Sequence, residues 1–284
     1  MIIYSIMGND QSRPAVIKFE HADIYNNSGK KTVADLSIDI RQGDFVYITG
    51  AVGIGKTTVI KAIIGAARIQ GGKASVFLTD RGRTREYNLR KLKERQIPSL
   101  RRKIGVAFQD LSLMTDKSIY ENLWSAMRAT GWRDRRKIKA NILELRDSNF
   151  FNIDKDKKKD ADKDFYRTRI DEYSGGQQKL VSIARALITE PDIIIMDEPT
   201  NSLAPEQIRT IMTRLRKENN DNRGTTVIIV THDQSLPAEY PGRILECRQE
   251  DNDTAAVCSW KECPEQQEPS QAYLQDEPAE LIVE

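Results

Sequence analysis

The stretch that decides the fold is Phe45-Val-Tyr-Ile-Thr-Gly-Ala-Val-Gly-Ile-Gly-Lys-Thr-Thr58. Its first part is a short apolar run, 44–49, typical of a buried strand, and helical spacing of apolar residues follows over 57–65. Between them, residues 50–57 fit the pattern G-x4-G-K-[ST] in full. A strand before the pattern and a helix after it are the context that a phosphate-binding loop requires.

The residue types of this loop suit a polyphosphate. Glycines let backbone N–H groups turn inward around phosphate oxygens, and the helix that follows adds its positive end. Lys56 is expected to reach the β- and γ-phosphates, Thr57 to ligate Mg²⁺, and Thr58 to add a hydrogen bond. A glycine-rich turn with a lone surface lysine is the alternative. The candidate nucleotide-binding residues are Gly50, Ala51, Val52, Gly53, Ile54, Gly55, Lys56, Thr57 and Thr58.

A pair of carboxylates follows a second apolar run, Ile193-Ile-Ile-Met-Asp197-Glu198. Asp197, at the tip of the expected strand, can hold Mg²⁺ through water. Glu198, one residue later, can orient or deprotonate an attacking water. A helix cap or a turn is the alternative interpretation of the pair. Together with the phosphate loop, the pair favours catalysis of phosphoryl transfer to water.

Composition narrows the class of protein. The chain has 284 residues, 39% of them hydrophobic and 30% charged, which leaves enough apolar material for a buried core. No apolar run approaches the roughly 18–20 residues that a membrane span needs. The opening residues lack the basic start and long apolar run of a secretory signal. We therefore expect neither an integral membrane protein nor a secreted one.

Charge is unevenly distributed along the chain. Residues 250–284 carry ten acids and one base, a net charge of −9, whereas residues 1–249 carry 43 bases and 32 acids, a net charge of +11. A basic body suits nucleic acid, nucleotides or an anionic membrane surface, and charge alone does not choose among them.

Cysteine usage indicates a reducing compartment. The three cysteines, Cys247, Cys258 and Cys263, are odd in number and all late in the chain, which does not predict a disulfide framework.

Strand-like and helix-like segments alternate along most of the chain, which predicts an α/β core with a mainly parallel sheet. We expect a lead-in at 1–14, one domain at 15–248, and an acidic, disordered tail at 249–284. Within the distinctive stretch at 147–172, the almost wholly charged run at 154–164 is expected to be a solvated loop.

A third motif lies shortly before the carboxylate strand: Tyr173-Ser-Gly-Gly-Gln-Gln-Lys179. With the phosphate loop and Asp197, it resembles the signature of ATP-binding cassette (ABC) ATPases over about residues 15–248. The resemblance implies a P-loop NTPase with a RecA-like core, an antiparallel β subdomain, and a helical subdomain at about 111–190. It implies binding of ATP and Mg²⁺, and Mg-dependent hydrolysis to ADP and phosphate.

The resemblance also assigns roles to single residues. Tyr25 is expected to stack on adenine, Gln109 to sense Mg²⁺ and the γ-phosphate as a metal ligand, and His232 to act as the switch histidine. Lys56, Glu198 and His232 are then the catalytic residues, and Thr57, Gln109 and Asp197 the metal ligands. In this family the signature closes over the ATP of the other subunit, which implies a homodimer. The signature residues expected to act in trans are Ser174, Gly175, Gly176 and Gln177.

Within the ABC ATPases, three stretches resemble the FtsE subfamily of bacterial cell-division ATPases. They are Ile17–His21, Ile97–Gly105 running into Phe108-Gln109-Asp110, and Ser118–Asn122. This likeness implies a peripheral protein on the cytoplasmic face of the inner membrane. It implies an FtsX-like integral membrane partner, a role in cell division and cell-wall remodelling, and no direct contact with nucleic acid. Met114 or Tyr120 is expected to contact the membrane partner, unless both are simply subdomain core.

Three alternatives remain open. The lipoprotein- and macrolide-export ATPases share much of the pattern, a soluble ABC protein acting on nucleic acid fits the basic body, and a nucleotide-gated scaffold needs little turnover. Two positions depart from the family pattern: Tyr173 stands where Leu is usual, and Ala204 where the family usually has Asp. The second change removes a carboxylate expected to communicate across the dimer.

Overall fold

A computed structural model describes residues 12–80, 82–148, 150–151, 165–221, 223–249 and 255–261. The strands are β1 (Ala15–Tyr25), β2 (Lys31–Arg41), β3 (Phe45–Thr49), β4 (Arg68–Gln70), β5 (Lys73–Asp80), β6 (Arg83–Asn88), β7 (Ile104–Ala107), β8 (Ile193–Asp197), β9 (Thr226–Val230), β10 (Arg243–Gln249) and β11 (Ala256–Trp260).

The α-helices are α1 (Lys56–Ile63), α2 (Ile97–Arg101), α3 (Ile119–Ala129), α4 (Arg135–Asp147), α6 (Gly175–Leu187), α7 (Pro205–Asn219) and α8 (Ser235–Glu239). Short 3-10 turns are η1 (Leu89–Lys91), η2 (Glu94–Gln96) and η4 (Ile170–Glu172). None of the helices within these described ranges is both long and apolar enough to cross a membrane.

The described strands form one sheet in the order β6-β5-β1-β2-β11-β10-β3-β9-β8-β7, with β4 paired to β1. Neighbouring strands from β10 to β7 run parallel, whereas β1 pairs antiparallel with β2, β4 and β5. Every residue of β3, β8 and β9 is buried, as expected of parallel strands covered on both faces. The mainly parallel core with an antiparallel part confirms the predicted fold class.

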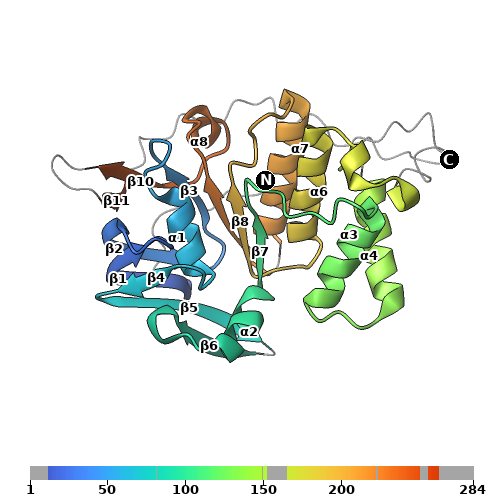
Figure 1. Cartoon of the computed structure of the whole chain (residues 1–284). Helices are drawn as coiled ribbons and strands as arrows, with labels where there is room; N and C mark the ends of the chain where they lie inside the picture. The colour runs from blue at the N-terminus through green and yellow to red at the C-terminus, as the bar shows by residue number, and fades with distance from the viewer. Residues whose placement is uncertain are drawn as a thin grey trace, which may run out of the picture.

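Two apolar clusters cover the two faces of the parallel strands. In β8, Ile193 and Ile195 face the cluster that contains α1, whereas Ile194 and Met196 face the cluster that contains α3, α4, α6 and α7. Figure 1 shows α6 and α7 beside β7 and β8, with α3 and α4 beyond them. The phosphate loop and the signature helix therefore belong to opposite faces of the sheet.

The expected domain boundary at residue 248 lies too early. Strand β11 continues the sheet, pairing antiparallel with β10 and, through Ala256, parallel with β2. Parts of three expected segments lie outside the described residues: 1–11 of the lead-in, 149 and 152–164 of the stretch at 147–172, and 250–254 and 262–284 of the acidic tail.

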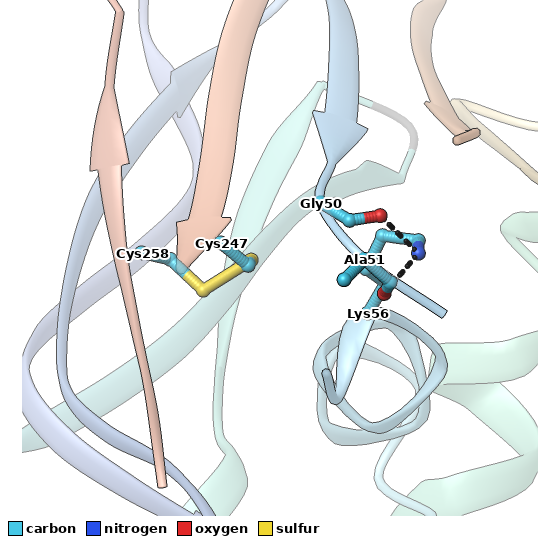
Figure 2. Close-up of a disulfide and its surroundings, with 5 residues drawn as sticks. All are labelled: Gly50, Ala51, Lys56, Cys247 and Cys258. Carbon is cyan, nitrogen blue, oxygen red and sulfur yellow. Dashed lines mark hydrogen bonds between the residues drawn. A yellow bond between two sulfur atoms is a disulfide. The ribbon is translucent and has the colours of Figure 1, made fainter. Parts of the chain in front are cut away.

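The cysteine count predicted no disulfide framework, whereas the structure contains one disulfide. Cys247 on β10 and Cys258 on β11 lie directly opposite each other, with 4.1 Å between their Cα atoms, and form a disulfide (Figure 2). Spacing in the sequence could not reveal this pair, because the second strand was not foreseen.

Candidate functional site

The phosphate loop connects the end of β3 to the start of α1, as predicted. Gly50 and Gly55 have φ values of +140° and +113°, a region that favours glycine. A Cβ on Gly50 would lie 2.3 Å from the carbonyl oxygen of Cys247, and one on Gly55 would lie 2.8 Å from Thr32 Cγ2. The loop is therefore packed tightly against β10 and β2, and only glycine fits these two positions.

Lys56 is the first residue of α1, and its side chain folds back over the loop. Its Nζ donates hydrogen bonds to the carbonyl oxygens of Gly50, at 2.7 Å, and Ala51, at 2.9 Å (Figure 2). Burial lowers the pKa of this ammonium, against the opposing effect of Glu198 and Asp197. Carbonyl oxygens of the loop thus hold the Lys56 ammonium. An anionic phosphate can compete with these oxygens for the ammonium.

The next residue of α1 contacts the tip of β8. Thr57 Oγ1 donates a hydrogen bond of 2.9 Å to Asp197 Oδ2, which joins residues 140 positions apart. Burial raises the pKa of the Asp197 carboxyl, and the Thr57 hydrogen bond opposes that rise. A hydroxyl and a carboxylate at this spacing are hard oxygen donors, and Mg²⁺ prefers such donors. The donor set fits the predicted magnesium ligands.

Glu198 and His232 meet at the carboxyl ends of β8 and β9. His232 Nδ1 lies 2.8 Å from Glu198 Oε1, and the Glu198 N–H donates to the carbonyl oxygen of Val230. Glu198 has a φ of +51°, an uncommon conformation for a residue with a side chain. Its other oxygen, Oε2, is buried and has no hydrogen-bond partner among the described residues. This orphaned acceptor suits a water molecule at the site.

The remaining expected nucleotide contacts come from strand ends. Tyr25 closes β1 and pairs with Lys31, next to the Thr32 that touches Gly55. Gln109 is exposed two residues beyond β7, whose last residue, Ala107, pairs with Met196 just before Asp197. Both residues therefore lie at or just beyond the end of a strand, and their contacts with ATP remain predictions.

The signature lies at the start of helix α6, which packs in a different core cluster from α1. Ser174 caps the helix by accepting a hydrogen bond from the Gln177 N–H, and the Gln177 side chain accepts one from the Ser174 N–H. Ser174 and Gly175 are exposed. An exposed serine-capped helix start is available to a second molecule, as the predicted role in trans requires.

Sequence reasoning missed one residue of the site, Lys179 on α6. Its Nζ donates hydrogen bonds to the carbonyl oxygens of Glu198 and of Asn201, the latter at 3.1 Å. Burial lowers the pKa of this ammonium, and Glu198 and Asp197 oppose the shift. The only sequence signal is a lysine directly before the apolar run Leu180–Ile183 in the signature helix. The contact links the signature helix to the catalytic carboxylate segment of the same chain.

Comparison with known families decides what this site is. The family model described as ABC transporter matches residues 33–201, which include the phosphate loop, the signature and both carboxylates. This chain belongs to the ABC transporter family. As a member of this family of ATPases, it binds nucleotide and hydrolyses ATP.

Several curated relatives within the family are cell-division proteins. The cell division ATP-binding protein FtsE of Streptococcus pneumoniae is 34% identical over 221 residues, which cover 78% of this chain and 86% of that protein. The FtsE of Escherichia coli is 32% identical over 233 residues, which cover 81% and 94%.

Solved ABC cassettes share the fold. The ATP-binding cassette MJ0796 in a dimeric post-hydrolysis state, bound to ADP and Pi, superposes with a TM-score of 0.66 at 25% identity. The match covers 84% of this chain and 96% of that one. A second dimeric structure of MJ0796 gives a TM-score of 0.65 at 27% identity, covering 81% and 93%.

Proposed function

We propose that this chain is the ATP-hydrolysing subunit of an FtsE/FtsX-type membrane complex that acts in cell division and cell-wall remodelling. The observation that carries the proposal is the FtsE likeness over about four-fifths of the chain, at 32–34% identity. The site supports the catalytic part, because the loop, the carboxylates and His232 meet at one edge of the sheet.

The residues divide the work of hydrolysis among them. Lys56 and the loop N–H groups bind the triphosphate, and Thr57, Asp197 and Gln109 would hold Mg²⁺. Bound there, Mg²⁺ would neutralise charge that develops on the phosphate oxygens. Glu198 orients the attacking water and accepts its proton, and His232 holds Glu198 through the 2.8 Å contact. Tyr25 stacks on the adenine.

Two copies of the chain complete each site. Ser174, Gly175, Gly176 and Gln177 of one copy close over the triphosphate bound by its partner. The exposure of the signature start supports this arrangement, as do the two dimeric structures of MJ0796. ATP-driven closure of the dimer would then move a membrane protein bound to its cytoplasmic side.

The membrane partner is proposed to contact α3 and the segment before it. Tyr120 is half-buried in an aromatic cluster, with ring centroids 5.0 Å from Tyr166 and 5.8 Å from Trp124. Met114 is half-buried, and its main chain is held by two hydrogen bonds to Asn122. Both side chains keep an exposed part, so either can contact a partner helix.

Co-purification with an FtsX-like membrane protein tests this function. We expect the pair to purify together and the partner to change ATP turnover. Met114→Glu or Tyr120→Glu should abolish co-purification while turnover of the isolated chain persists, and Ser125→Glu, at an exposed position of α3, is the matched control. Unchanged co-purification of both variants would remove this surface from the interface. Failure of the unmodified chain to bind FtsX would refute the proposed complex.

A further inference from the structure

The positive charge of this chain is concentrated in two segments. We call residues 83–102 the β6–α2 segment and residues 128–139 the α3–α4 segment. Together they carry 14 bases and three acids, a net charge of +11, whereas the rest of residues 1–249 carries 29 of each sign. The fourteen bases are Arg83, Arg85, Arg90, Lys91, Lys93, Arg95, Arg101, Arg102, Arg128, Arg133, Arg135, Arg136, Lys137 and Lys139.

These fourteen bases are presented to solvent. All fourteen side chains are exposed, and none of them forms an ion pair in the part of the chain that the structure describes. Two of the three acids in the segments are engaged elsewhere: Glu86 accepts a hydrogen bond from Ser75, and Asp134 caps α4. Unneutralised charge of this density attracts an anion.

Contacts at the start of β7 and β8 bring the two segments to one edge of the sheet. Lys103, next to the β6–α2 segment, lies 3.7 Å from Asp192, and Glu190 accepts a hydrogen bond of 3.1 Å from Asn141 of α4. Lys137 lies one helical turn before Asn141. In Figure 1 both segments lie along the lower margin of the molecule. This edge is opposite the one that carries the phosphate loop, so the basic surface is not part of the nucleotide site.

The chain itself contains an anionic segment that leaves the fold at the same edge. The N–H of Lys261 donates to the carbonyl oxygen of Ile244, near the start of β10, a strand parallel to β3. Residues 262–284 follow directly, with seven acids and no base. We propose that residues 262–284 occupy the basic surface formed by the β6–α2 and α3–α4 segments of the same chain.

The segment is long enough to do so. In the sheet order, β10 and β7 are four strands apart, which is about 19 Å at roughly 4.8 Å per strand. Twenty-three residues can extend over about 75 Å, so the span is easily covered. Tethering to the fold gives the segment a local concentration on the order of millimolar.

The expected contact is electrostatic and therefore weak and reversible. An exposed ion pair contributes about 0–1 kcal/mol, and salt screens it, so stabilisation comes from many simultaneous pairs and from tethering. A polyanion that binds this basic surface is therefore expected to compete with the acidic segment for it.

Zero-length carbodiimide cross-linking of the full chain tests the contact directly. We expect cross-links from Lys91, Lys93, Lys137 or Lys139 to carboxylates of residues 262–284, and their loss at about 0.5 M salt. Lys30 and Lys117, which are also exposed, serve as control lysines. A mixture of isotope-labelled and unlabelled chains distinguishes cross-links within one chain from cross-links between two chains. Cross-links between chains, or equal cross-linking of the control lysines, would overturn the proposal.

A full-length variant with a neutral acidic segment provides the second test. Its seven changes are Glu262→Gln, Glu265→Gln, Glu268→Gln, Asp276→Asn, Glu277→Gln, Glu280→Gln and Glu284→Gln. We expect its affinity for heparin at low salt to rise on the order of tenfold over the parent. Equal affinity of parent and variant would refute masking of the surface. Neither test measures ATP turnover, so a negative result in either one leaves the proposed catalytic function untouched.

Discussion

Removing the Lys179 ammonium tests whether the signature helix positions the catalytic carboxylate. Lys179 donates to the carbonyl oxygens of Glu198 and Asn201, in a segment where Glu198 and Ser202 have φ values of +51° and +63°. Such backbone conformations cost roughly 1–3 kcal/mol each and persist only where the surroundings hold them. Charge-assisted hydrogen bonds of this kind contribute about 1.5–3 kcal/mol each in favourable cases. Lys179→Met keeps the length of the side chain and removes both bonds.

Because the hydrogen bonds of Lys179 go to the segment after β8 and not to the phosphate loop among the described residues, we expect the variant to bind ATP as the parent does. If about 1.4 kcal/mol of the lost interaction falls on the transition state, kcat falls about tenfold. KM for ATP stays unchanged, and Lys179→Arg restores most of kcat because it returns a cationic donor. Steady-state ATPase kinetics of the three proteins, with exposed Lys217→Met as the control, give the answer. A parental kcat for Lys179→Met would refute the positioning role.

Three further outcomes follow from the site and the sheet. Glu198→Gln should retain ATP binding, lose turnover by about a hundredfold or more and trap the dimer; turnover at the parental rate would show that Glu198 is not the base. Burial raises the pKa of Asp197, so the Asp197 carboxyl holds its proton more tightly in the folded chain than in the unfolded chain. As pH rises above about 4, Asp197 ionises and the folded chain loses stability. By calorimetry, Asp197→Asn should therefore have a higher melting temperature than the nucleotide-free parent at neutral pH, and this difference should vanish toward pH 4. Its Mg-dependent turnover should fall at least about tenfold. An unchanged melting temperature at neutral pH would contradict the burial argument. Reduction of the Cys247–Cys258 disulfide, which spans a sequence separation of 11, should cost about 2–3 kcal/mol and lower the melting temperature by about 5 °C. The melting temperature of Cys258→Ser should be the same with and without reductant. If reductant also left the melting temperature of the parent unchanged, that result would argue against the disulfide.

Much of the nucleotide site could be predicted because its signals are local. A strand, a glycine pattern and a helix follow one another within residues 45–63, so the loop could be recognised without knowledge of the rest of the chain. The apolar runs that became β8 and β9 were equally clear, because strands buried on both faces need no alternation.

Strands β10 and β11 were harder to predict for a physical reason. Their exposed positions carry polar and charged residues, and each strand is stabilised by partners distant in sequence, β3 and β2. Intrinsic strand preference depends strongly on such neighbours. Because β11 was not predicted, the expected domain ended too early and the pairing of Cys247 with Cys258 was not recognised.

Residue types and their spacing were enough to identify the chemical groups of the site: the glycine cradle, the lysine, the threonine, the two carboxylates, the histidine and the signature. Each is recognisable from residue type and spacing, because a loop or a helix start is built from consecutive residues. Only the tertiary structure decided which groups meet. Glu198 and His232 are 34 residues apart and Thr57 and Asp197 are 140 apart, and they touch because the parallel strands end at the same edge of the sheet. The same packing gave Lys179 its two carbonyl partners and brought two basic segments to the opposite edge, since contacts across the sheet leave no trace in local spacing.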